Sequence, residues 1–371
     1  MKTRVLLLST TLAGFAMASA QAQVPTVVAD TPVVHSLAAK VMGDLGTPTL
    51  MLDRGADPHN FQLRPTQAQA LAQAGIVFWV GPELAPWMAR AVDGVGVQGP
   101  VVALLEVEGV ALRDFAHGHS HDHDAHGHDD HDHGHDDHGH DDHAHDDHDH
   151  GHDHGHDDHA HDDHDHGHDH GHDDHAHDDH AHDDHGHDDH AHHDHAHDGV
   201  DPHAWLDPRN AAVWVTAIAA ELSALDPDNA ETYAANADAA AARITEVEAE
   251  LRDILAPMGD APIVVFHDAY GYFAHHFGVN VTGTVTLGDA APPGAARLSE
   301  LRDMLREGEV VCIFPEVNHS SRHVDMLVEG TGVRVGALLD PAGVAMEPGA
   351  DLYTTLMRDL ATNLAACVTE G

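Results

Sequence analysis

The sequence is poor in basic residues, with 16 Lys and Arg against 64 Asp and Glu and a formal net charge of −48. Such a chain is repelled by phosphate backbones and by anionic headgroups, so nucleic acid and anionic membranes are excluded as expected partners. After the N-terminus, no stretch approaches the roughly 20 apolar residues that a membrane-spanning helix needs. A His-Glu-x-x-His motif is also missing, which leaves little support for a zinc hydrolase.

Cysteine is nearly absent, because Cys312 and Cys367 are the only two. Two cysteines alone make a poor zinc site. In an oxidising compartment they can pair, and the chain-entropy model assigns roughly 4 kcal/mol to closing a loop of roughly 55 residues. The alternative is a pair of buried free thiols.

The N-terminus indicates that the compartment is oxidising. Lys2 and Arg4 precede an apolar run over Val5–Met17, and small residues that fit a cleavage site follow near Ala20 and Ala22. This pattern is typical of a cleaved signal peptide, and its apolar run is too short for a membrane anchor. No cysteine lies near the cleavage site, so we expect a lipid-free protein in the periplasm.

A low-complexity tract runs from His117 to His197, where 81 residues include 36 His and 28 Asp and the remainder are Gly, Ala or Ser. Without larger apolar residues it has nothing to bury, so we expect it to be disordered. Its histidine pairs can chelate metal ions at many weak to moderate sites. It can therefore concentrate metal near a tighter site, buffer excess zinc or dock a periplasmic zinc chaperone, or it is an expanded loop with little functional effect.

The remaining sequence alternates between strand and helix patterns, which predicts two α/β lobes with parallel sheets. A segment from Pro227 to about Ala256 has no internal Gly or Pro, and we interpret it as one long rigid helix that joins the lobes. The expected boundaries are a signal peptide at 1–22, an N-terminal lobe at 23–116 and 200–226, the tract at 117–199, the linking helix at 227–257 and a C-terminal lobe at 258–371.

The expected helices are 33–42, 64–74, 208–225, 270–277, 296–306, 323–329 and 351–368. The expected strands are 26–29, 49–52, 76–80, 262–266, 279–285, 310–314 and 333–338.

Three histidines lie at or beyond the carboxyl ends of expected strands, where α/β domains bind their ligands. His59 and His203 each end an Asp-Pro-His sequence, and His267 directly follows the strand that ends at Phe266. Neutral imidazoles suit zinc. Asp340 lies beyond another strand and can complete or neutralise such a site.

These motifs resemble the zinc-uptake (ZnuA-like) branch of the metal-binding solute-binding proteins. The resemblance rests on Asp-Pro-His at 57–59, Asp-Pro-His-Ala-Trp-Leu-Asp-Pro at 201–208 and Phe-His-Asp-Ala-Tyr-Gly-Tyr-Phe at 266–273, in that order around a His-rich insertion. It implies two α/β lobes joined by one long helix, with Zn(II) in the cleft between them. The implied partners are an ABC transporter permease and its ATPase, and a monomer is expected.

The resemblance also assigns residues. His59, His203 and His267 match the family's three ligands, and Asp340 matches a position where manganese and iron relatives supply a carboxylate. Cys312 and Cys367 match a disulfide of some zinc members. Manganese relatives carry a carboxylate in place of His267, so an imidazole there favours zinc.

Two departures leave the fourth ligand open between Asp340, water and a histidine of the tract. Pro58 stands where some zinc members have Glu, and His319 stands where relatives often have an aromatic residue. His319 is an accessory ligand or, more simply, a surface residue. The other histidines outside the tract, which are His35, His275, His276 and His323, are expected not to bind the ion.

The expected function is thus zinc capture for an uptake transporter, without enzymatic activity. The competing hypotheses are a manganese or iron receptor of the same family, a metal store that works through the tract, and a zinc hydrolase.

Overall fold

The structure, a computed structural model, describes residues 24–115, 199–286 and 293–370. The expected signal peptide and the His/Asp tract lie outside the described residues. Within them, the chain forms two four-stranded parallel sheets, one in each expected lobe. Among these residues, no helix has the length and the apolar composition needed to cross a membrane.

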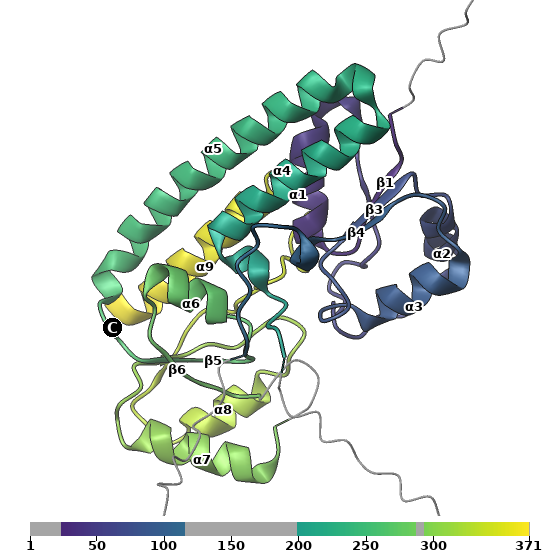
Figure 1. Ribbon diagram of the computed structural model, residues 1–371. Helices are drawn as coiled ribbons and strands as arrows, with labels where there is room; N and C mark the ends of the chain where they lie inside the picture. The colour runs from purple at the N-terminus through teal and green to yellow at the C-terminus, as the bar shows by residue number, and fades with distance from the viewer. Residues whose placement is uncertain (1–23, 116–198, 287–292, 371) are drawn as a thin grey trace, which may run out of the picture. The chain divides into compact units, whose positions relative to one another are not determined.

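The N-terminal sheet has the order β2-β1-β3-β4 (Figure 1). Its strands are β1 (Val27–Ala29), β2 (Thr49–Leu50), β3 (Ile76–Trp79) and β4 (Val101–Ala103), and its helices are α1 (Pro32–Met42), α2 (Pro65–Ala72) and α3 (Pro86–Val95). The central strands β1 and β3 are buried throughout. This explains their continuous apolar sequences, because helices cover both faces of such a sheet.

The C-terminal sheet has the order β6-β5-β7-β8, which is the same order counted within its own lobe. Its strands are β5 (Ile263–Val265), β6 (Val281–Thr284), β7 (Cys312–Ile313) and β8 (Arg334–Val335), and its helices are α6 (Gly271–Phe277), α7 (Ala295–Arg306), α8 (Arg322–Val328) and α9 (Leu352–Thr369). In this order the chain reverses direction across the sheet between its first and third strands, and ligands bind beyond the carboxyl ends of strands at such a point.

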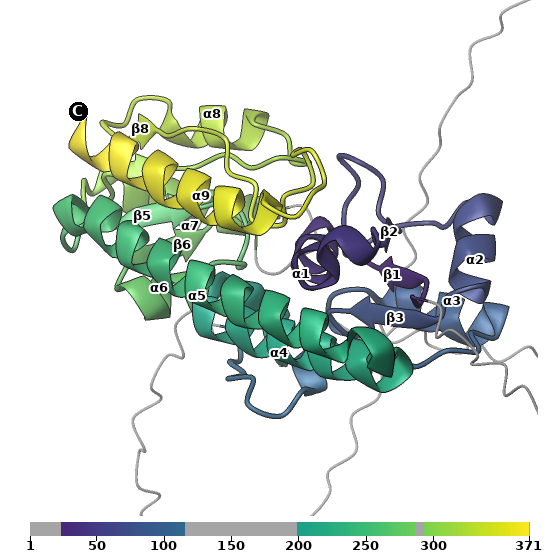
Figure 2. The same ribbon diagram turned by 90° about the horizontal axis from the view of Figure 1, so that it is seen from above.

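Between the sheets run α4 (Pro208–Leu225) and α5 (Ala230–Leu255), which lie side by side in both views (Figures 1 and 2). The expected linking helix is therefore present, and its 26 residues span about 39 Å. It also packs against α1 and α9. One continuous apolar core includes residues of both sheets and of these helices, so the lobes share more than a single helix.

The bend between α4 and α5 depends on Asp226, whose carboxylate is fully buried. Its Oδ2 accepts hydrogen bonds from Asn229 Nδ2 at 2.7 Å and from the Tyr233 hydroxyl at 2.9 Å. A 3₁₀ turn at Pro227–Asn229 therefore precedes α5, where the sequence predicted helix from Pro227 onward.

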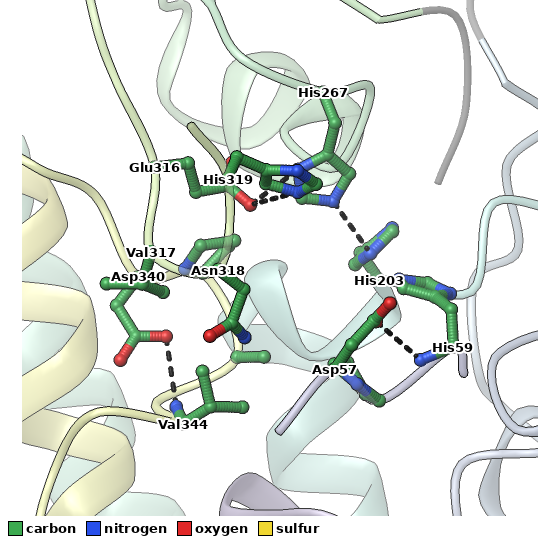
Figure 3. Close-up of a pocket in the computed structure, with 13 residues that line it drawn as sticks. Asp57, His59, His203, His267, Glu316, Val317, Asn318, His319, Asp340 and Val344 are labelled. Atoms are coloured by element: carbon green, nitrogen blue, oxygen red, sulfur yellow. Dashed lines mark hydrogen bonds and ion pairs between the residues drawn. The ribbon is translucent and has the colours of Figure 1, made fainter. Parts of the chain in front are cut away.

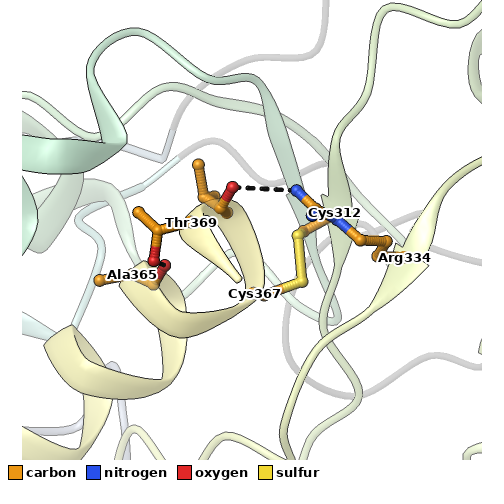
Figure 4. The surroundings of a disulfide bond; sticks show 6 residues. Cys312, Arg334, Ala365, Cys367 and Thr369 are labelled. Atoms are coloured by element: carbon orange, nitrogen blue, oxygen red, sulfur yellow. Dashed lines mark hydrogen bonds between the residues drawn. A yellow bond between two sulfur atoms is a disulfide. The ribbon is translucent and has the colours of Figure 1, made fainter. Parts of the chain in front are cut away.

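The disulfide joins Cys312 in β7 to Cys367 in α9, with the two Cα atoms 6.3 Å apart (Figure 4). Beside it, Arg334 Nη2 donates to the Val368 carbonyl at 3.0 Å. This is the pairing that the resemblance implies, and it fastens the last helix to the centre of the C-terminal sheet.

Asp30 follows β1 and is fully buried. Its two carboxylate oxygens accept hydrogen bonds from the backbone N–H groups of Thr31 at 2.6 Å and Val80 at 2.9 Å, which ties the end of β1 to the end of β3. Burial raises the pKa of Asp30 to about 6, although these hydrogen bonds oppose the shift. The carboxylate is therefore costly to ionise in the folded protein.

Asp30→Asn is expected to remove a pH dependence of stability. Because the folded pKa lies above the unfolded value, protonated Asp30 favours folding at low pH, and this advantage is lost as pH rises from about 4 to about 6. The difference in unfolding free energy between the parent and Asp30→Asn should change by on the order of 2 kcal/mol over that range. Urea unfolding of metal-free protein from pH 4 to 7.5 measures it, and a constant difference would contradict the assignment.

Candidate metal-binding site

The two Asp-Pro-His sequences fold into the same local turn. In each, the aspartate Oδ1 accepts a hydrogen bond from the histidine backbone N–H two residues later, at 2.9 Å for Asp57 with His59 and 2.9 Å for Asp201 with His203. Such a turn is a common use of Asp, and the intervening Pro restricts the backbone. The repeated motif is thus a device that presents a histidine side chain from a loop.

His203 lies between the end of the tract and α4. Asp114 and Val200 pair in an isolated antiparallel bridge, Phe115 N donates to Gly199 O at 3.3 Å, and Asp201 N donates to Arg113 O at 2.8 Å. The last described residue before the tract, Phe115, therefore lies beside the first one after it, Gly199, which is two residues before Asp201.

The imidazoles of His59, His203 and His267 converge (Figure 3). Their ring centroids are 5.4 Å apart for His59 and His203, 6.2 Å for His59 and His267, and 5.2 Å for His203 and His267. One ring nitrogen from each lies within 4.8 Å of the others. They line a cavity of about 30 Å³, large enough for an ion or a water molecule.

Two buried carboxylates set the tautomers of two rings. His203 Nδ1 lies 2.8 Å from Asp201 Oδ1, and His267 Nδ1 lies 2.7 Å from the carboxylate of Glu316. A carboxylate accepts, so each Nδ1 carries the donated proton. In the neutral rings both Nε2 atoms then present lone pairs, and these two atoms face each other at 3.4 Å.

Between two neutral rings, that contact fits a bound cation. Two lone pairs repel each other, whereas a tetrahedral zinc ion with Zn–N bonds of about 2.0–2.1 Å requires its nitrogen ligands to lie about 3.3–3.4 Å apart. The measured separation of His203 and His267 therefore matches the spacing that a shared zinc ion needs.

The His59 ring is held neutral by its surroundings. Burial lowers the pKa of His59 well below its ordinary value, and the neighbouring His203, His267 and His319 lower it further. Metal ions bind the deprotonated imidazole, so the His59 ring needs no proton release at neutral pH.

Neither Glu316 nor a role for the Asp201 carboxylate is predicted from the sequence. Glu316 follows β7, which pairs directly with β5, so the sheet brings it beside His267 at the point where the chain changes direction. Its carboxylate also accepts a hydrogen bond from the Tyr270 hydroxyl at 3.2 Å. The available signal was a carboxylate just beyond the apolar strand at 310–314.

Asp340 lines the same cavity, but its carboxylate bonds to backbone N–H groups of the loop that follows it (Figure 3). Its Oδ1 accepts from Val344 N at 3.0 Å and its Oδ2 from Ala345 N at 2.8 Å. Burial raises its pKa. Within the described part of the chain, Asp340 belongs to neither cluster of metal-binding groups, so the structure does not bring its carboxylate together with the three imidazoles.

The loop that Asp340 supports contacts the loop of His59. Gly55 N donates to Val344 O at 2.8 Å, and the Arg54 guanidinium donates to Ala345 O and pairs with Glu347. In this arrangement Asp340 stabilises the segment that holds the His59 loop across the cavity.

The remaining histidines fall into two sets. His35, His275, His276 and His323 are in neither metal-binding cluster of the described residues. His276 instead lies between the carboxylates of Asp207 and Glu248, at 2.9 Å from each, and near Arg252. His319 forms a second cluster with His267 and Glu316.

Known proteins are similar to this chain in fold and in sequence. The chain resembles the high-affinity zinc uptake system protein ZnuA of Paracoccus denitrificans, with 45% identity over 96% of this chain and 95% of the relative. A crystal structure of ZnuA aligns with a TM-score of 0.62 at 19% identity, covering 92% of this chain and 97% of that one. The SBP FpvC from Pseudomonas aeruginosa, in complex with Mn2+, aligns with a TM-score of 0.64 at 19% identity, covering 94% and 99%.

Because those structural likenesses include a manganese complex, the shared fold does not decide the metal. The sequence decides the family: a model described as zinc-uptake complex component A, periplasmic, matches residues 27–367. With that match and the close Paracoccus relative, the chain belongs to the family of periplasmic zinc-uptake components.

Proposed function

We propose that this zinc-uptake component captures Zn(II) in the cavity between the His59, His203 and His267 imidazoles. The observation that carries the proposal is the 3.4 Å contact between two Nε2 atoms whose rings each donate through Nδ1 to a buried carboxylate. Zinc accepts such a set of neutral nitrogen ligands readily.

Carboxylates that bond to the ligand imidazoles, and not to the ion itself, balance the charge of the ion. Asp201 and Glu316 are both buried, and each bonds to a ligand imidazole. Together they offset the two positive charges of Zn(II), and this supports capture without a carboxylate bound directly to the metal. We propose water as the fourth ligand, because Asp340 would have to give up a backbone hydrogen bond to reach the ion.

The captured ion is then passed to an ABC transporter permease, with its ATPase supplying the energy, by a monomeric receptor in the periplasm. Family membership supports the role in an uptake complex. The tract at 117–197 lies outside the described residues, and we propose that it raises the local zinc concentration or docks a metal chaperone.

Deleting residues 117–197 is the experiment that isolates the cavity. The flanking residues already pair at Phe115 and Gly199, so Ala116 and Asp198 can close a two-residue hairpin loop. The shortened protein is expected to keep one tight zinc site and to lose most of the zinc that the full chain binds. Isothermal titration and metal analysis of both proteins measure the stoichiometry.

A shortened protein without a tight zinc site would refute the cavity assignment. Competition between Zn(II) and Mn(II) in the same protein tests the metal: zinc is expected to displace manganese, and the reverse result would favour a manganese or iron receptor.

A further inference from the structure

A second group of metal-binding side chains joins two residues of the loop after β7, Glu316 and His319, to His267, which follows β5. His267, Glu316 and His319 each offer a ligand atom within 4.8 Å of the others, and His267 also belongs to the three-histidine cluster. His319 Nε2 lies 3.7 Å from Glu316 Oε1, and all three residues line the same cavity. The two clusters are therefore contiguous and share one residue (Figure 3).

The exposed fraction of the cavity side chains falls from His319 through Glu316 to His203, toward the proposed zinc position. The side chain of His319 is 29% exposed, that of Glu316 is 4% exposed, and that of His203 is 2% exposed. An ion that approaches from solvent along this path meets the partly exposed His319 before it meets the buried His203 and His267.

The position of His319 is fixed by its surroundings. Its ring stacks on Phe266, with centroids 4.4 Å apart and planes inclined by 21°. The preceding residue, Asn318, has a positive φ of 68°, which is uncommon for a residue other than Gly. Asn318 Nδ2 also donates to Ala56 O at 3.3 Å, just before the turn that presents His59. The loop is thus held against the His59 loop by specific contacts.

We propose that His319 and Glu316 form an outer zinc position, through which the ion passes on its way between solvent and the three-histidine cavity. This inference rests on the proposed function and adds a step to it. In the outer position the ion binds the His319 imidazole and a Glu316 oxygen and keeps water in its remaining positions.

The outer position has a chemical reason. A hydrated Zn(II) ion must lose its water molecules before it can bind the three imidazoles, of which His203 and His267 are buried, and the loss of several at once is costly. A carboxylate and an imidazole replace part of the hydration shell with ligands that zinc accepts. The ion can then exchange its remaining waters for the buried rings one at a time.

The test compares His319→Phe with His323→Phe in the protein that lacks residues 117–197. Phe retains an aromatic ring against Phe266 but offers no ligand atom. His323 is a matched control, because its ring also lies near Phe266, at 6.4 Å, yet it is in neither cluster of the described residues. The measurements are the zinc association rate by stopped flow, the release rate to a chelator and the Kd by competition.

A group that acts only during passage changes both rates but not the equilibrium. We expect His319→Phe to slow association and release by at least about 5-fold each, with a Kd within about 3-fold of the parent. His323→Phe should leave all three values unchanged. An additional variant, His319→Ala, also removes the ligand atom but introduces no new ring. It should show the same kinetic pattern, which excludes a disturbance of the loop by Phe as the cause.

Rates for His319→Phe and His319→Ala that equal those of the control would overturn the outer position. A Kd that weakens by about 100-fold with unchanged association would overturn it too, because His319 would then be a ligand of the final site. The proposed function fails differently, since the parent itself would then lack a tight site.

Discussion

Replacing His59 with Ala is expected to weaken zinc binding by at least about 100-fold, because even residues that only support a metal ligand contribute roughly 10–100-fold. His59 is the most informative of the three histidines. Its neighbours His203 and His267 bond to buried carboxylates, so removing either ring also leaves a buried charge without its partner. The turn at Asp57 bonds to the backbone of residue 59 and persists in the Ala variant.

The comparison is best made by chelator competition in the protein that lacks residues 117–197, so that tract histidines do not mask the loss. His275→Ala serves as the control, because this exposed histidine on α6 is in neither metal-binding cluster of the described residues. An affinity for His59→Ala within about 5-fold of the parent would refute the three-histidine site.

The same variant separates transport from storage in cells. If the cavity delivers zinc for uptake, His59→Ala should impair growth on scarce zinc more than deletion of the tract does. A store that works through the tract predicts the opposite order. The two outcomes depend on different parts of one chain, so a single growth experiment with both variants distinguishes them.

Local sequence predicted most of the helices well. The helix expected to start at Pro208 and end at about Leu225 has those bounds, because Asp207 caps its first turn and Asp226 begins the bend that follows. Gly43 ends α1 with a positive φ, a conformation that glycine adopts at low cost. These signals lie within a few residues of the boundaries that they set.

The elements that were missed depend on distant partners. The sequence predicts no helix or strand between 81 and 115, but the structure has α3 and β4 there. β4 is three residues long and partly exposed at the edge of the sheet, so its only strand-defining feature is its pairing with β3. β8 is likewise shorter than expected, because few of its residues pair with β7.

In the site, too, local sequence predicts some features, whereas others depend on residues far apart in the chain. The Asp-Pro-His motifs, the end of the strand at 262–266 and the family resemblance identified the three histidines, and the structure brings their rings together. The partners that orient them were out of reach, because Glu316 is 49 residues from His267 and meets it only once β5 and β7 are neighbours. Asp340 lies near the cavity as expected, but its hydrogen bonds to Val344 and Ala345 depend on a loop conformation that no local pattern reveals.

Glu316→Gln is expected to weaken zinc binding by roughly 10–100-fold, through the orientation and charge of His267. Gln preserves the shape of the side chain but removes the negative charge. Its amide can also donate to His267 Nδ1, which would move the ring proton to Nε2, where it blocks the metal. Asp201 would still hold His203, so binding should be weakened and not abolished.

A merely structural role for Glu316 would not change the tautomer. Nitrogen NMR of the metal-free parent should show His267 protonated at Nδ1, and Glu316→Gln should introduce the Nε2 form. Glu309→Gln, an exposed substitution at the other end of the same strand region, should alter neither the spectrum nor the Kd. If Glu316→Gln bound zinc as tightly as Glu309→Gln, the buried carboxylate would not be needed to balance the ion, and direct coordination by Asp340 would become the better account of its charge.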